Sequence, residues 1–166
     1  MKGRDTGSGK GVVLNLHIDG ASKGNPGEAG AGIWIADGEG KKILEMSRYL
    51  GHKTNNEAEY WALLLGLREA KRLGAKSIRV FTDSELVGKQ VNGLYRVKNE
   101  NLKVLHASVM KQLREFPSYA VESIPREGNR EADRLANEAV RRGMEKEKGG
   151  SWREPMVAPR EGSFEP

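Results

Sequence analysis

VVLNLHID, residues 12–19, is the stretch that decides the fold, because it predicts a β-strand that ends on an acidic residue. Apolar residues occupy alternate positions from Val12 to Ile18, and this period of two is typical of a strand with one buried face. The strand is predicted to end on Asp19. A carboxylate beside a core costs several kcal/mol to desolvate unless a cation neutralises it, so the position of Asp19 needs a physical reason.

Two more strands are expected directly after this one. Residues 20–27 are rich in Gly and contain Asn-Pro, which is the composition of a turn. The stretch AGIWIA, residues 31–36, predicts a second strand, and residues 41–50 predict a third. The first three strands are therefore expected to form an antiparallel meander.

The segment TNNE, residues 54–57, predicts the start of a helix that ends near Leu73. Thr54 and Glu57 have the spacing of a capping box, which gives Glu57 a structural task. The positions four, seven, eleven and fourteen residues after Glu59 are small or apolar, so Glu59 heads the stripe that faces the sheet. The two glutamates are thereby assigned different tasks.

A fourth strand is predicted at residues 77–83, and it ends on Asp83. Because a helix precedes it, we expect it to lie parallel to the first strand after a right-handed crossover. Helices are expected at residues 84–91 and 101–116, and a fifth strand at residues 119–124.

The last helix is predicted to begin at Asn129, which is a good N-cap residue. Asp133 borders its apolar face. Four acidic residues thus fall at strand ends or on inward stripes, namely Asp19, Glu59, Asp83 and Asp133. Taken singly, each also fits an ordinary role at a strand end or in a first helical turn. Together they would repel one another, and a hard metal ion bound through oxygen ligands would neutralise them.

The chain of 166 residues suits one domain. The periodic patterns span residues 12–142, so we expect a flexible N-terminus at 1–11 and a flexible tail at 143–166, where charged residues, Gly and Pro replace the periodicity. A formal net charge of +5 favours a polyanionic partner.

The absence of cysteine excludes disulfides, thiolate zinc sites and cysteine nucleophiles. The longest strongly apolar stretch, residues 60–67, is too short to span a bilayer. We therefore expect a cytoplasmic protein without a membrane partner, and a monomer as the default state.

Four motifs in this order resemble ribonuclease H type 1. They are DGASKGNPG (19–27), TNNEAEY (54–60), FTDS (81–84) and NREADRLAN (129–137). The resemblance implies an α/β ribonuclease H-like fold, with a five-stranded mixed sheet of three antiparallel strands followed by two parallel ones, flanked by helices. It also implies endonucleolytic hydrolysis of the RNA strand of RNA/DNA hybrids.

The resemblance assigns the catalytic and metal-binding roles to Asp19, Glu59, Asp83 and Asp133. In this assignment Asp19 is shared by two ions, Glu59 and Asp83 hold the ion at the leaving group, and Asp133 lies on the nucleophile side. Carboxylate ligands suit Mg²⁺, with Mn²⁺ as a plausible substitute.

The resemblance also implies a substrate-binding surface. The expected residues are Gly20, Ala21, Ser22, Asn25, Thr54, Asn55 and Asn56. Glycine-rich backbone can approach the ribose closely, and the 2′-hydroxyl is what distinguishes RNA from DNA. Lys53 is expected near a phosphate of the hybrid.

The chain departs from many relatives in two places. The loop before the last helix has no histidine, and Arg126 is the nearest candidate for its role. Since a guanidinium stays protonated, Arg126 can bind a phosphate or help expel product but cannot act as a general base. The basic, Trp-rich protrusion of many relatives is also missing, as in the compact archaeal and related bacterial forms. Substrate contacts are then expected from Lys89, Arg96, Lys98 and Lys103.

Two alternatives remain open at this point. One is a related nuclease of the same fold that acts on double-stranded RNA or structured DNA, because fold and acids do not set the substrate by themselves. The other is a nucleic-acid-binding module that has lost turnover. The presence of all four acids disfavours the second alternative.

Overall fold

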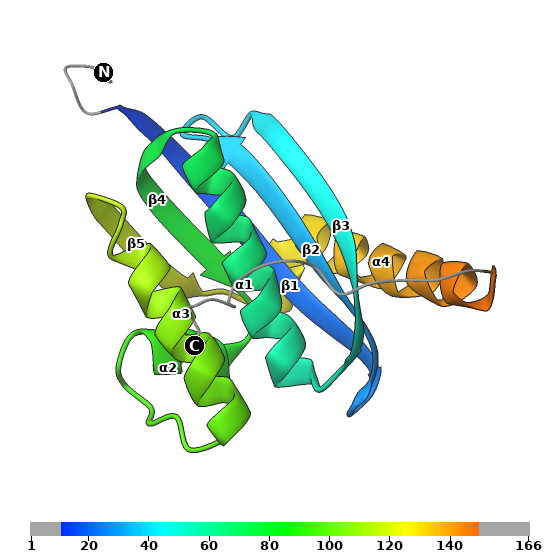
Figure 1. Cartoon of the computed structure of the whole chain (residues 1–166). Helices are drawn as coiled ribbons and strands as arrows, with labels where there is room; N and C mark the ends of the chain where they lie inside the picture. The colour runs from blue at the N-terminus through cyan, green and yellow to red at the C-terminus, as the bar shows by residue number, and fades with distance from the viewer. Residues whose placement is uncertain (1–10, 150–166) are drawn as a thin grey trace.

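The computed structural model describes residues 11–149, which form one five-stranded sheet with helices on both faces (Figure 1). The strand order is β3-β2-β1-β4-β5. The first three strands pair antiparallel, whereas β4 pairs parallel to both β1 and β5. The mixed sheet expected from the sequence is confirmed.

The elements follow the predicted order along the chain. Their bounds are β1 Val12–Gly24, β2 Gly27–Asp37, β3 Lys42–Lys53, α1 Asn55–Arg72, β4 Ala75–Thr82, α2 Glu85–Val91, α3 Glu100–Leu113, β5 Ser118–Ser123, a 3₁₀ turn Arg126–Asn129, and α4 Arg130–Gly149.

The first strand does not end on Asp19, as the sequence had suggested. It continues to Gly24 and pairs with β2 as far as Gly27, so the expected turn at residues 20–27 shrinks to two residues. The parallel partner β4 stops earlier, where Thr82 lies opposite Ile18. Asp19 is therefore the first residue of β1 without a β4 neighbour. It lies at the opening of the sheet, the point where β1 continues beyond the end of β4.

Helix α1 packs closely on β1. Gly66 makes this possible, because a Cβ atom built there would lie 2.8 Å from a methyl carbon of Leu16. The stripe predicted to face the sheet is confirmed, since Leu63 and Ala70 are fully buried. The capping box is also confirmed: Thr54 Oγ1 accepts from Glu57 N, and Glu57 Oε1 accepts from Thr54 N. The orientation of α1 is thereby fixed from its first turn.

Helix α4 lies against the opposite face of the sheet, mainly on β2 (Figure 1). Two glycines of β2 allow this approach. A Cβ atom on Gly32 would lie 2.1 Å from the carbonyl oxygen of Ala132, and one on Gly30 would lie 2.7 Å from that of Ala136. This contact places the first turns of α4 beside the opening of the sheet.

Helix α4 continues to Gly149, beyond the boundary expected at Arg142. The buried stripe explains the extension: Gly143 is buried against the ring of Tyr49, and Met144 is half-buried. The remaining flexible segments expected at the two ends, 1–10 and 150–166, lie outside the described residues.

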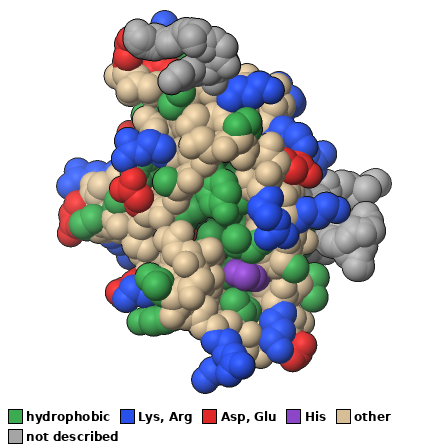
Figure 2. Space-filling model, turned by 90° about the vertical axis from the view of Figure 1, so that its left-hand side faces the viewer, with side chains coloured by type: hydrophobic (Ala, Val, Ile, Leu, Met, Phe, Trp, Pro, Cys, Tyr) green, Lys and Arg blue, Asp and Glu red, His purple; other side chains and the backbone are tan. Residues whose placement is uncertain are grey.

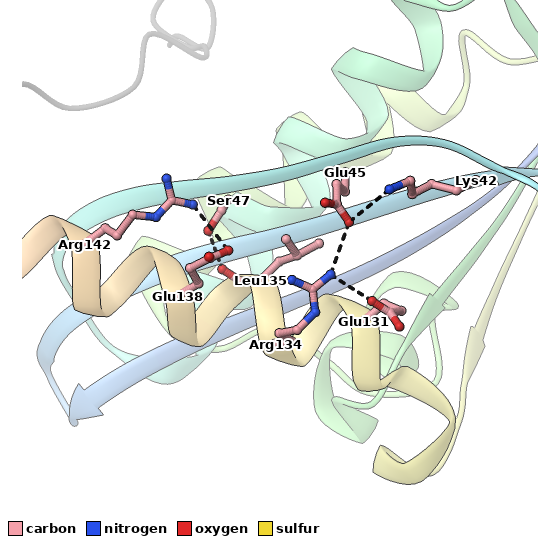
Figure 3. Close-up of polar contacts among 8 residues, drawn as sticks. All are labelled: Lys42, Glu45, Ser47, Glu131, Arg134, Leu135, Glu138 and Arg142. Atoms are coloured by element: carbon pink, nitrogen blue, oxygen red, sulfur yellow. Dashed lines mark hydrogen bonds and ion pairs between the residues drawn. The ribbon is translucent and has the colours of Figure 1, made fainter.

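Polar contacts join α4 to β3 on the outer surface (Figure 3). Arg134 pairs with Glu45 at 3.1 Å and with Glu131 at 2.9 Å, and Ser47 Oγ donates to the carbonyl oxygen of Leu135. The Arg134 side chain is 51% exposed, so these ion pairs contribute little beside the buried packing.

No helix in the described part of the chain is long and apolar enough to cross a membrane.

Candidate active site

Three carboxylates meet at the opening of the sheet. They come from the middle of β1 (Asp19), the first turns of α1 (Glu59) and the residue after β4 (Asp83). One carboxylate oxygen of each lies within 4.8 Å of the others. Asp19 is only 5% exposed and Glu59 only 6%. Asp83 is half-buried, and the three acids together could hold a metal ion.

The Glu59 carboxylate is held in place on both oxygens. Oε2 accepts from the backbone N of Gly20 at 3.0 Å, and Oε1 accepts from the hydroxyl of Thr82 at 3.3 Å. The sequence reading had not singled out Thr82, which is buried at the end of β4. These contacts fix the carboxylate before any cation binds.

Burial raises the pKa values of the three clustered carboxyl groups. Burial, reinforced by the neighbouring Glu59 carboxylate, raises the pKa of Asp19 to about 11. Burial likewise raises the pKa of Glu59 to about 7. It also raises the pKa of Asp83, although the Arg126 guanidinium acts in the opposite direction. Asp19 and Glu59 therefore retain protons at a higher pH than exposed carboxyl groups do.

Asp133 and Arg126 border the carboxylate cluster. Asp133 belongs to the first turns of α4, and Arg126 to the 3₁₀ turn before it. Their side chains pair, with Nη2 of Arg126 3.2 Å from Oδ1 of Asp133. Asn137 donates to the same Asp133 oxygen at 3.3 Å. Asp133 is thus brought to the site, where it is more exposed to solvent than Asp19 and Glu59.

Asn129 directly precedes α4, as predicted, but its side-chain hydrogen bonds go to other elements. Its side chain is 1% exposed, donates to the carbonyl oxygen of Ile18 at 2.9 Å, and lies 3.2 Å from Nδ1 of His17. It also hydrogen-bonds Asp83. His17 in turn stacks on Phe81, with ring centres 4.7 Å apart. An asparagine before a helix is typical of an N-cap. The sequence pattern therefore did not reveal the buried contacts of Asn129 with β1 and Asp83.

A cleft of about 450 Å³ contains the cluster. Five of the seven expected substrate-binding residues line it: Gly20, Ala21, Ser22, Asn55 and Asn56. The other two act at its border, since Thr54 caps α1 and the side-chain oxygen of Asn25 accepts from Asn55 N at 3.0 Å. The lining residues Ser84 and Asn137 end two of the quoted motifs, but the sequence analysis assigned neither of them a role in the site.

The four cations expected to contact substrate lie on α2, on α3 and in the loop between them, and two of the four are engaged in ion pairs. Lys89 pairs with Glu85 at 2.8 Å and Lys103 with Glu100 at 3.1 Å. No ion pair is recorded for Arg96 or Lys98 within residues 11–149. Figure 2, turned to the side where β5 lies in Figure 1, shows Lys and Arg side chains spread around a central apolar area. Positive charge on this face is distributed rather than concentrated.

Known proteins share the fold of this chain. A family model described as reverse transcriptase-like matches residues 17–139. A crystal structure of RNase H1 from the halophilic archaeon Halobacterium salinarum matches with a TM-score of 0.77 and 35% identity, covering 78% of this chain and 98% of that one. The chain belongs to the ribonuclease H family. Divalent metals are the usual cofactors of this family, and the oxygen-only donors of the cluster suit such ions.

Two further relatives show how much of this ribonuclease H-like chain, and of each relative, the similarity covers. A crystal structure of LC11-RNase H1 in complex with an RNA/DNA hybrid matches with a TM-score of 0.76 and 38% identity, covering 79% of this chain and 99% of that one. A bifunctional protein of Mycobacterium tuberculosis is 40% identical over 127 residues, or 75% of this chain. The match spans 35% of that longer relative.

Proposed function

We propose that the protein is an endoribonuclease that hydrolyses the RNA strand of RNA/DNA hybrids with the aid of two Mg²⁺ ions. The observation that carries this proposal is the convergence of Asp19, Glu59 and Asp83 in a cleft that Asp133 also lines. The hybrid bound to the similar LC11-RNase H1 supports the choice of substrate. Mn²⁺ is expected to substitute for Mg²⁺.

Hydrolysis of a phosphodiester requires water to attack phosphorus opposite the leaving oxygen. Bound divalent cations supply Lewis acidity for both oxygens. The chain contributes the four carboxylates that would hold the cations, with Glu59 fixed by Gly20 and Thr82. Arg126 keeps a positive charge beside Asp133, where it can bind a phosphate oxygen.

Selection of RNA is assigned to the other wall of the cleft. The backbone of residues 20–22 lies next to the carboxylates, and the amide side chains of Asn55 and Asn56 face the same space. Such groups hydrogen-bond a 2′-hydroxyl, which a DNA strand lacks. We place recognition of the cleaved strand here.

Cleavage of end-labelled strands tests the proposal. An RNA/DNA hybrid is compared with RNA/RNA and DNA/DNA duplexes in Mg²⁺, using the unmodified protein, Asp83→Asn and the control Glu85→Gln. Glu85 lies two residues away but is 72% exposed and paired with Lys89. We expect hybrid cleavage by the unmodified protein and by Glu85→Gln, and none by Asp83→Asn.

The other outcomes separate the alternatives. Cleavage of RNA/RNA as well would widen the substrate class to double-stranded RNA. Hybrid binding without cleavage in Mg²⁺ or Mn²⁺ would replace the enzyme with a binding module. Equal activity of Asp83→Asn and the unmodified protein would contradict the assigned site.

A further inference from the structure

A second groove continues from the active-site cleft along α4. It has a volume of about 520 Å³ and lies between the tip of β1 and the middle of α4. The two spaces share three lining residues, Ala21, Ser22 and Asn137. A strand whose phosphate lies at the carboxylates can therefore continue into this groove without leaving the surface.

The helical period places polar side chains along one edge of this groove. Asp133, Asn137 and Arg141 follow one another at intervals of four residues, so they lie on one face of α4. Asp133 lines the cleft, Asn137 lines both spaces, and Arg141 lines the groove. From Asp133 to Arg141 the distance along the helix axis is about 12 Å, enough to reach a phosphate beyond the scissile one.

The opposite edge of the groove carries a second cation. Lys23 is exposed near the end of β1 and lines the groove across from α4. Within residues 11–149, no ion pair or hydrogen bond is found for the side chain of Lys23 or of Arg141. Both charges are therefore available to an anion. Glu145, one turn beyond Arg141 on α4, also lines the groove, so a carboxylate lies at the end of the groove away from the cleft.

The composition of the groove suits a nucleic-acid backbone better than a small apolar ligand. Two cations and the Asn137 amide face it, while Val140 and Met144 supply an apolar floor. Phosphate oxygens bind such cations and amides, and a sugar can lie on an apolar surface. We propose that this groove binds the backbone of the cleaved RNA strand on one side of the scissile phosphate, with Lys23 and Arg141 as its phosphate contacts. The inference rests on the proposed function and extends the substrate site beyond the carboxylate cleft.

The test compares two neighbouring arginines of α4. Arg141→Ala removes a charge from the groove, whereas Arg142→Ala removes the same charge from the other side, where Arg142 pairs with Glu138 at 3.3 Å. Hybrid cleavage is measured over a series of salt concentrations. We expect Arg141→Ala to raise KM about threefold to tenfold with little change in kcat, and to reduce the salt dependence of binding by about one unit of log–log slope.

Hybrids in which one strand is shortened show whether the groove holds the RNA strand or the DNA strand. If the groove holds RNA, the KM effect of Arg141→Ala disappears when the RNA strand ends beside the scissile phosphate on the groove side and the DNA strand is kept at full length. Lys23→Ala is expected to show the same loss of effect. An effect that depends instead on the length of the DNA strand would overturn the assignment to RNA.

The outcomes also separate this inference from the proposed function. Equal KM values and salt slopes for Arg141→Ala, Arg142→Ala and the unmodified protein, with normal hybrid cleavage, would overturn the groove alone. Absence of hybrid cleavage by the unmodified protein would count against the proposed function. In that case hybrid binding by the same three proteins still tests the groove, because the salt slope does not depend on turnover.

Discussion

Glu57 and Glu59 lie two residues apart in α1, yet the structure gives them different tasks. Glu57 accepts from Thr54 N at 2.9 Å, whereas both oxygens of Glu59 are held beside Asp19 and Asp83. We expect Glu59→Gln to lose Mg²⁺-dependent cleavage because it removes a charge that is proposed to bind metal. Glu57→Gln should keep kcat and cost about 0.5 to 1 kcal/mol of stability. Hybrid cleavage and urea unfolding of both variants measure this difference, and a reversed pattern would contradict the assignment.

Asn129 shows what residue patterns leave out. Periodicity and strand ends led to the four acids, because a carboxylate on an inward stripe is unusual. An asparagine before a helix is ordinary, and only the folded chain shows that Asn129 joins Ile18, His17 and Asp83. These partners lie far from it in sequence, so no local pattern records the contact.

Removal of this amide should affect both stability and catalysis. Asn129→Ala leaves the buried carbonyl oxygen of Ile18 without its recorded donor, at a cost of about 1 to 3 kcal/mol. It also releases Asp83, so we expect a lower kcat and a higher half-saturating Mg²⁺ concentration. Asn92→Ala is the control, because its amide donates to Val121 O at 3.0 Å away from the carboxylates. A similar loss of kcat in both variants would mean that Asn129 acts only through stability.

At the scale of elements, the strand ends were the part that the sequence located least well. The glycine-rich run 20–27 favoured a turn, but β1 and β2 extend their pairing through it to Gly24 and Gly27. Pairing between strands is decided by the partner, which a single segment does not reveal. The helices were easier to predict, since a cap such as that of Thr54 is a local signal, and this cap is confirmed.

The position of α4 depends on the glycines of β2. Gly32→Ala would place a methyl group against the Ala132 carbonyl, so we expect a loss of about 1 to 3 kcal/mol from overpacking. Because the same turn of α4 carries Asp133, cleavage should also fall. Gly38→Ala is a matched control, since a Cβ atom there meets nothing within 4 Å. Thermal unfolding and hybrid cleavage of the two variants measure the effect, and equal values would contradict the close contact.

The ion pairs between α4 and β3 should matter much less than this packing. Arg134→Ala removes contacts to Glu45 and Glu131, but the three side chains are 38 to 53% exposed. We expect a loss of at most about 1 kcal/mol, decreasing further at high salt. Urea unfolding at two salt concentrations measures it. A loss larger than that of Gly32→Ala would show that charge rather than packing holds α4 in place.

At the scale of the whole molecule, the acidic cluster links folding to pH and to metal. Burial raises the pKa of Glu59 to about 7 and that of Asp19 to about 11, from 4.5 and 3.8 in the unfolded chain. Between these values the folded state binds more protons than the unfolded state, so the free energy of unfolding falls as pH rises. From about pH 5 to pH 8 we expect the metal-free protein to lose stability, by at most about 1.4 kcal/mol per pH unit for each group.

Mg²⁺ should reverse this loss, because it binds the deprotonated carboxylates of the folded state and has no comparable site in the unfolded chain. Its stabilising effect is therefore expected to increase with pH over the range in which the metal-free protein weakens. Urea unfolding in EDTA and in Mg²⁺, at about pH 5 and pH 8, measures both effects. Asp19→Asn is the control, since it removes the carboxyl group whose pKa is raised furthest and should flatten both dependences. Stability in EDTA that stays level or rises with pH in the unmodified protein would show that the cluster does not retain protons, and equal stabilisation of both proteins by Mg²⁺ would place the cation elsewhere.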